Sequence, residues 1–140
     1  MRQKILCFDI GSKVIGVAIS DAFGTVAFPR PEIHWGGNLA TFEQELRTML
    51  KDEPGIRDVV VGVPPEPSPS MTKAFETVTL LLKRLGLAVH PVDEHVTTAE
   101  AKNKAEDIEL ETGVPFPGGR LDSLAAQIIL ERYFSLGTSI

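Results

Sequence analysis

Apolar positions along the first twenty residues follow the pattern of two short strands. Residues Lys4–Ile10 form an apolar run of β-favouring side chains, and Val14–Ser20 forms a second run. Between them, Gly11-Ser12-Lys13 has the composition of a turn. Because so short a connection cannot reach a parallel strand, the pattern predicts an antiparallel hairpin.

A third strand is expected within Gly24–Ile33, which would complete a meander. Pro29 and Pro31 interrupt this segment, and proline has no N–H group to donate to a sheet. We therefore expect the third strand to be broken at these two positions.

Helical and strand patterns alternate along the rest of the chain. Apolar residues at helical spacing predict three helices, over residues 39–51, about 71–85 and about 121–134. Asp58–Val63 is typical of a strand that is covered on both faces, and Leu87–Val92 predicts a fifth strand. The sequence Thr97-Thr98-Ala99-Glu100 fits a capping box that begins a further helix, and a long loop follows over residues 107–119.

This order of elements predicts an α/β fold with a five-stranded mixed sheet and helices on both faces. The later strands should be parallel to the first, because helical crossovers join them. A length of 140 residues fits a single domain over residues 1–140. Ligands bind such sheets at the carboxyl ends of the parallel strands, and this end is where a functional site is expected.

Composition narrows the class of protein further. The chain is 43% apolar, has one cysteine, and shows no segment of the length needed to cross a bilayer. Cys7 lies in an apolar run and is expected to be a buried strand residue. A cytoplasmic protein without membrane contact is the simplest interpretation. The net charge of −5 argues against a uniformly basic nucleic-acid surface, so phosphate contacts would need a local group of basic residues.

Acidic residues occur where the predicted fold places ligands. Asp9 interrupts the first strand, Asp93 and Glu94 end the fifth, and Asp122 lies in the first turn of the last helix. Each has a structural alternative: Asp9 as a turn cap, the 93–94 pair as support for the capping box, and Asp122 as a partner of the helix dipole. Alternation along a strand allows only one of Asp93 and Glu94 to face the site, and the pattern leaves open which one.

Taken together, three carboxylates from two strand ends and one helix start predict a site for two divalent cations. Mg²⁺ and Mn²⁺ prefer oxygen ligands, and a metal pair can activate water for phosphodiester cleavage. Ser12 and Lys13 in the turn, His95, and Arg120 are candidate substrate-binding residues. A solvated hairpin tip is an equally good interpretation of the turn residues.

Four segments resemble the YqgF (RuvX-like) nucleases. Residues 8–18 (FDIGSKVIGVA) resemble the opening motif of this family, and residues 60–64 (VVGVP) resemble its strand ending in Gly-x-Pro. Residues 92–101 (VDEHVTTAEA) and 121–126 (LDSLAA) are similar to its second acidic block and its closing helix. The segments occur in the family's order and span nearly the whole chain.

The resemblance implies a ribonuclease-H-like fold, shared with resolvases of the RuvC type. It implies that Asp9, Glu94 and Asp122 are the catalytic and metal-binding acids, with Glu94 preferred over Asp93. The implied activity is metal-dependent hydrolysis of nucleic-acid phosphodiesters, in 5′-end maturation of pre-16S rRNA or in Holliday-junction resolution. The implied partners are structured RNA and DNA junctions, and the implied state is a monomer or a weak homodimer.

The chain departs from the family pattern in three places. His95 stands where the family has arginine, which removes a permanent positive charge. Prolines stiffen residues 64–69, where the family has a flexible loop, and Glu66 adds an acid there. Before Asp122, the basic residues of the family are reduced to Arg120. All three predicted metal-ligand positions are present, so these departures bear on substrate choice and turnover.

Two other classes of function remain open at this stage. A non-catalytic nucleic-acid-binding scaffold of the same fold would explain the proline-rich loop, His95 and the acidic charge. An ATP-binding protein of the sugar-kinase or actin type also has an acid-x-Gly turn after a strand. That class needs two domains around its nucleotide, which 140 residues supply only in a dimer. A metal-dependent cleavage assay and a calorimetric test of ATP binding distinguish these classes.

Overall fold

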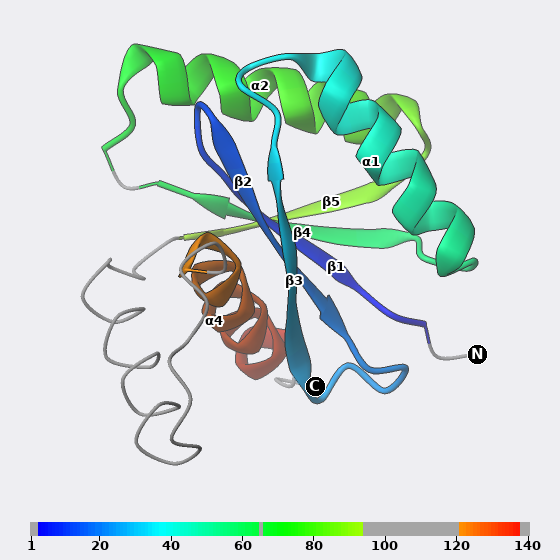
Figure 1. The fold of residues 1–140 in the computed structure, drawn as a ribbon. Coiled ribbons are helices and arrows are strands. Elements are labelled where there is room, and N and C mark those ends of the chain that lie inside the picture. Colours follow the sequence, from blue (N-terminus) through cyan, green and yellow to red (C-terminus); the bar gives the residue numbers. More distant parts are fainter. Residues whose placement is uncertain (1–2, 65, 94–120, 138–140) are drawn as a thin grey trace, which may run out of the picture.

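A computed structural model of the chain describes residues 3–64, 66–93 and 121–137, except for the side chains of residues 121, 122 and 137. Five strands form one mixed sheet in the order β3-β2-β1-β4-β5. The strands are β1 (Leu6–Ile10), β2 (Val14–Ser20), β3 (Ala27–His34), β4 (Asp58–Val63) and β5 (Ala88–Asp93). The helices are α1 (Leu39–Asp52), α2 (Pro69–Arg84) and α4 (Leu121–Gly137). Figure 1 shows α1 and α2 on one side of the sheet and α4 on the other.

The pairing of the strands confirms the predicted topology. β1 pairs with β2, and β2 with β3, in antiparallel register, as expected for strands joined by short connections. β4 pairs with β1, and β5 with β4, in parallel register. A helical crossover precedes each of these parallel strands, because a parallel neighbour cannot be reached by a turn.

Alternation along the central strand divides the core into two layers. Leu6, Phe8 and Ile10 of β1 pack in the layer that also contains buried residues of α1 and α2. Cys7 packs on the opposite side with Val60 of β4 and with α4, where it is fully buried as predicted. Successive side chains of a strand point to opposite faces, so β1 supplies apolar side chains to both layers.

Capping side chains fix the starts of the first two helices. Asn38 precedes α1, and its side chain accepts hydrogen bonds from the amides of Ala40 and Thr41. Ser68 caps α2, which begins at Pro69, two residues before the predicted start. Proline is favourable there because the first residue of a helix needs no N–H partner. Pro69, the last of the prolines that exclude residues 64–69 from a strand, is therefore also the first residue of a helix.

The expectation that proline breaks the third strand is wrong. β3 is continuous from Ala27 to His34, with Pro29 opposite Ala18 of β2. β3 lies at an edge of the sheet, where only one side of the strand needs hydrogen-bond partners. The irregularity that does occur is a register shift between Ile15 and Val17 of β2.

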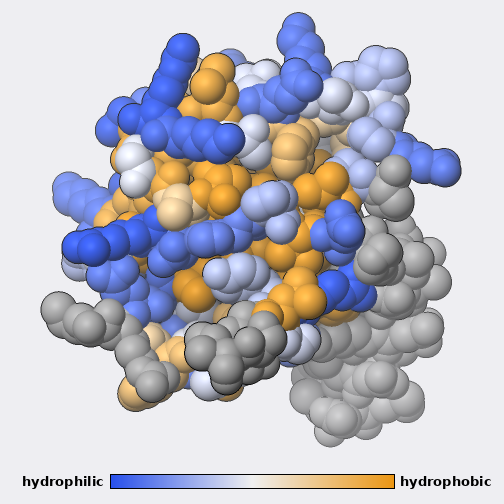
Figure 2. Space-filling model, turned by 180° about the vertical axis from the view of Figure 1, so that it is seen from behind, coloured by the Kyte–Doolittle hydropathy of each residue, from blue (hydrophilic) through white to orange (hydrophobic). Residues whose placement is uncertain are grey.

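The surface of the molecule is consistent with a fold that is built around these two core layers. Viewed from behind, hydrophobic side chains reach the surface in the middle of the face, with hydrophilic side chains around them (Figure 2). No helix within the described part of the chain is long and apolar enough to span a membrane. The predicted capping-box helix and the loop at residues 107–119 lie outside the described residues.

Candidate active site

Asp9 lies at the carboxyl end of the sheet, meaning the end at which β1, β4 and β5 finish. It is the fourth residue of β1 and pairs with Gly16 of β2. Its neighbours Phe8 and Ile10 belong to the α1/α2 layer, so alternation directs Asp9 to the α4 side, as it does Cys7. The residue is half-buried. A carboxylate is thus placed on the α4 face where β1 ends.

The start of α4 is attached to the strand next to Asp9. The amide of Val17 donates to the hydroxyl oxygen of Ser123 at 3.1 Å, and both residues are buried. Val17 adjoins Gly16, the partner of Asp9, and lies at the register shift in β2. Since Asp122 precedes Ser123, this bond fixes the backbone of Asp122 in the first turn of α4 beside the β1–β2 pair.

The role of Ser123 was not predicted from the sequence. Its hydroxyl bonds an amide 106 positions away in the chain, and no local pattern reports such a contact. The available signal was a polar residue on the apolar side of a helix, directly after a candidate acid. One turn further along α4, the Gln127 side chain donates to the carbonyl of Ala27 in β3 at 3.0 Å, which gives the helix a second attachment.

The end of β5 bears on the choice between Asp93 and Glu94. Val92 packs in the α4 layer and pairs with Gly62 of β4. Alternation therefore turns the exposed side chain of Asp93 to the other face, away from the side on which Asp9 lies. Arg132 of α4 donates to the backbone carbonyl of Asp93 at 3.4 Å. Glu94 itself, like His95 and Arg120, lies outside the described residues.

The turn between β1 and β2 requires glycine at its first position. The amide of Gly11 donates to the carbonyl of Val14 at 3.0 Å, which closes the turn. A Cβ atom on Gly11 would lie 2.5 Å from that carbonyl oxygen, well inside van der Waals contact. Gly11 is therefore needed for close backbone approach two residues after Asp9.

The segment after β3 holds the same turn from outside. The indole nitrogen of Trp35 donates to the carbonyl of Gly11 at 3.0 Å, and the amide of Gly36 donates to the carbonyl of Lys13 at 2.9 Å. Ser12 is half-buried and Lys13 is exposed. Two of the predicted substrate-binding residues thus lie in a fixed turn at the same end of the sheet as Asp9.

The fit of this site to a metal depends on the chemistry of its donors. Within the ranges that the structure describes, no three His, Cys, Asp or Glu side chains converge on one point. The predicted set joins Asp9 to Glu94 and the Asp122 side chain, which lie outside that description. All three donors are carboxylates, which suit hard divalent cations. The metal site remains a prediction that the position of Asp9 supports.

Solved structures with a similar fold include Holliday junction resolvases. T. thermophilus RuvC in complex with a Holliday junction substrate is similar with a TM-score of 0.63 at 13% identity, covering 98% of this chain and 96% of that one. The Fowlpox virus resolvase with Holliday junction DNA is similar with a TM-score of 0.62 at 15% identity, covering 97% and 99%. At such low identity the likeness concerns the fold, and it confirms the predicted ribonuclease-H-like architecture.

Sequence comparison identifies the family. A "Putative pre-16S rRNA nuclease" of Koribacter versatilis is 32% identical over 95% of this chain and 87% of that protein. A relative of the same name in Salinibacter ruber is 31% identical over 96% of this chain and 94% of its own length. Residues 3–136 match the family described as RuvX, Holliday junction resolvase. The chain therefore belongs to the RuvX family.

Proposed function

We propose that this protein is a metal-dependent endonuclease that hydrolyses nucleic-acid phosphodiester bonds in the 5′-end maturation of pre-16S rRNA. The main observation that supports this proposal is the position of the Asp9 carboxylate. It lies on the α4 face, beside a helix start that the Ser123–Val17 hydrogen bond fixes. The relatives that match almost the whole chain are named as pre-16S rRNA nucleases, which supports this substrate. The proposed place of action is the cytoplasm, and residues 1–140 are the proposed single domain that carries the activity.

Asp9, Glu94 and Asp122 are the proposed ligands for Mg²⁺ or Mn²⁺, with two ions in the site. Divalent ions held by carboxylates lower the pKa of a bound water and stabilise negative charge on the leaving oxygen. Glu94 is preferred over Asp93, because Asp93 alternates away from the face on which Asp9 lies.

The substrate-binding part of the proposal rests on the turn after β1 and on two residues beyond the described ranges. Lys13 is exposed and Ser12 half-buried in a turn that Trp35 and Gly36 hold in place. A fixed turn holds hydrogen-bond donors in place to contact a phosphate, so little conformational entropy is lost on binding. His95 and Arg120 are the proposed additional phosphate contacts.

Holliday-junction resolution is the second candidate reaction. The description of the family and the substrates in both solved neighbours favour it. Paired cuts in a two-fold junction call for a dimer, whereas maturation of an RNA end does not. The oligomeric state that we propose, a monomer or weak homodimer, would suit the first reaction better, and cleavage of the two substrates decides between them.

The test is a cleavage assay on structured RNA and on a four-way DNA junction with Mg²⁺ or Mn²⁺. Asp9→Asn should lower the cleavage rate more than about 100-fold. Loss of a residue that only orients a metal ligand costs about 10–100-fold, and loss of the metal ligand itself should cost more. Asp93→Asn is the matched control and should retain activity. A wild-type protein that binds both substrates and cleaves neither would instead be a scaffold of the same fold.

A further inference from the structure

A groove separates the β1–β2 turn from α2 at the carboxyl end of the sheet. Its volume is about 280 Å³, and it lies on the α1/α2 side, across the end of the sheet from the face of Asp9. The residues that line it come from the turn, the segment after β3 and the first half of α2: Ser12, Trp35, Gly37, Ser70, Lys73, Ala74 and Thr77. Nothing in the proposed metal site accounts for this groove.

Several polar groups of the groove already have partners. The hydroxyl of Thr77 donates to the carbonyl of Lys73 at 2.7 Å. At the start of α2, the amides of Met71 and Thr72 both donate to Ser68, to its side chain and its carbonyl respectively. These groups are therefore not available to donate to a ligand.

Two donors of the groove remain available. Lys73 is exposed, and among the described residues no carboxylate lies within ion-pair distance of its ammonium group. The Ser12 hydroxyl has no hydrogen-bond partner within the same ranges. An ammonium group and a hydroxyl that line one groove can together bind an oxyanion.

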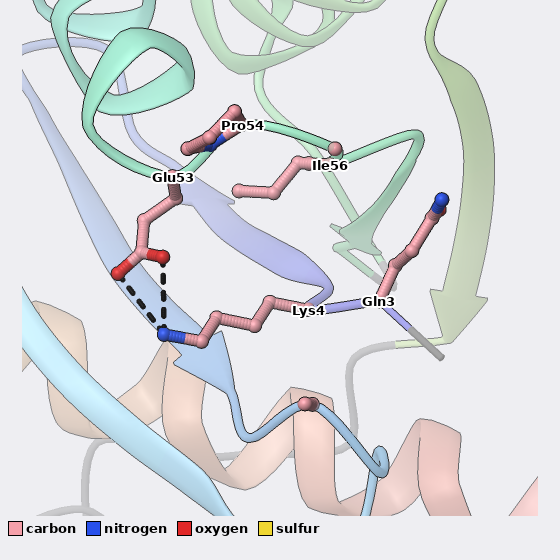
Figure 3. Close-up of a pocket in the computed structure, with 7 residues that line it drawn as sticks. Gln3, Lys4, Glu53, Pro54 and Ile56 are labelled. Carbon is pink, nitrogen blue, oxygen red and sulfur yellow. Dashed lines mark hydrogen bonds and ion pairs between the residues drawn. The ribbon is translucent and has the colours of Figure 1, made fainter. Parts of the chain in front are cut away.

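A second pocket shows that a lysine on a pocket wall is not always free to bind a ligand. At the other end of the sheet, a pocket of about 250 Å³ is lined by Lys4 and Glu53, among others. The Lys4 ammonium there contacts both carboxylate oxygens of Glu53, at 3.1 and 3.0 Å (Figure 3). The Glu53 carboxylate neutralises that lysine, whereas none of the described carboxylates pairs with Lys73.

We propose that Lys73 and the Ser12 hydroxyl bind a backbone phosphate of the nucleic-acid substrate, a few nucleotides from the bond that is cut. The proposal rests on the proposed function. Ser12 follows Asp9 by three residues, so their Cα atoms lie at most about 11 Å apart. A strand of B-DNA rises about 3.4 Å per nucleotide along the helix axis, so a few nucleotides span a distance of this order. A strand could thus pass from the face of Asp9 over the turn into the groove.

The test measures binding without cleavage. A fluorescent RNA hairpin and a four-way DNA junction are titrated in EDTA at 50 to 200 mM salt against wild type and Lys73→Gln. Loss of one phosphate contact should weaken binding about fivefold and reduce the slope of log K against log salt by about 0.7–0.9. Lys73→Arg should restore both quantities, because it restores the positive charge.

Lys83→Gln is the matched control, an exposed lysine on the same helix about 15 Å further along. It should bind within twofold of wild type. Equal weakening by both variants would show a general charge effect and overturn the subsite, as would a Lys73→Gln variant with wild-type affinity and slope. An unchanged thermal midpoint confirms that Lys73→Gln is folded.

The two proposals fail in different ways. If Asp9→Asn abolishes cleavage while Lys73→Gln leaves binding unchanged, the nuclease stands and the subsite falls. If wild type cleaves nothing while Lys73→Gln still weakens binding, the subsite stands on a nucleic-acid-binding protein and the nuclease falls. Wild type that binds neither probe overturns both.

Discussion

The two ends of the sheet differ in how the chain uses its charged groups. At the amino end, Lys4 is paired with Glu53 at 3.0 Å, and the Nε2 atom of His90 lies 2.8 Å from the Asp58 carboxylate. At the carboxyl end, Lys13 and Lys73 have no carboxylate partner among the described residues. These two pairs neutralise charged groups within the chain, whereas the described part of the chain leaves the two lysines at the carboxyl end without an ion pair.

The loop between β2 and β3 extends this contrast at the amino end. The Thr25 hydroxyl, followed by the amides of Val26 and Thr25, donates to the Asp21 carboxylate and lowers its pKa to about 2. The bonds that stabilise this charge all come from the loop itself. Charges that are satisfied internally serve the fold, whereas charges left open at the strand ends are available for a substrate. The predictions below test this distinction.

The largest effect is expected from Gly11→Ala. The added Cβ would lie 2.5 Å from a backbone oxygen, so the main chain must shift. We expect a loss of about 3 kcal/mol of unfolding free energy, measured by urea denaturation, together with reduced cleavage. Gly55→Ala at the amino end has open space around its Cβ but a φ of +98°, so backbone strain alone should cost about 1–2 kcal/mol. Equal costs would contradict the steric argument.

An intermediate effect is expected from Ser123→Ala. The substitution leaves the buried amide of Val17 without its acceptor, which costs about 2 kcal/mol. It also releases the start of α4, so cleavage should fall by about tenfold or more. Ser135→Ala, an exposed serine near the other end of α4, should change stability by less than about 0.5 kcal/mol. Full activity in Ser123→Ala would show that this bond does not position the site.

The smallest effect is expected from Asp21→Asn, and it depends on pH. Because folding lowers the pKa of Asp21 from 3.8 to about 2, the stabilisation by its charge is present above pH 3.8 and is lost toward pH 2. The difference in thermal midpoint between wild type and Asp21→Asn should shrink over this interval. Thr25→Val removes the hydrogen bond that lowers the pKa of Asp21 most. The pKa in the folded protein should then lie closer to 3.8, so stability should be lost over a narrower pH interval. A difference that is constant with pH would exclude the ionised carboxylate as its source.

Local patterns predicted most of the fold. β2 and β4 lie where alternation and apolar runs indicated, because each is bounded by a turn or a proline visible in the sequence. β3 was predicted incorrectly, because its tolerance of proline depends on its place at the edge of the sheet. Edge position is a property of the assembled sheet and cannot be read from the strand.

The candidate site was predictable where its residues lie in the strand pattern. Asp9 stood out as a charge in an apolar strand, and the turn residues Ser12 and Lys13 followed from it. The contact between His90 and Asp58 could not be predicted from a local pattern, because Asp58 lies 32 residues away on the neighbouring strand. The proposed roles of Glu94 and of the Asp122 side chain remain predictions.

Proline occurs in both outer strands of the sheet and in none of the three inner ones: Pro29 and Pro31 lie in β3, and Pro91 lies in β5. An incoming strand from another molecule would find donors missing along either border. Within the described residues the sheet ends at these two proline-containing strands. We therefore expect these two borders to contribute little to aggregation through added β-strands.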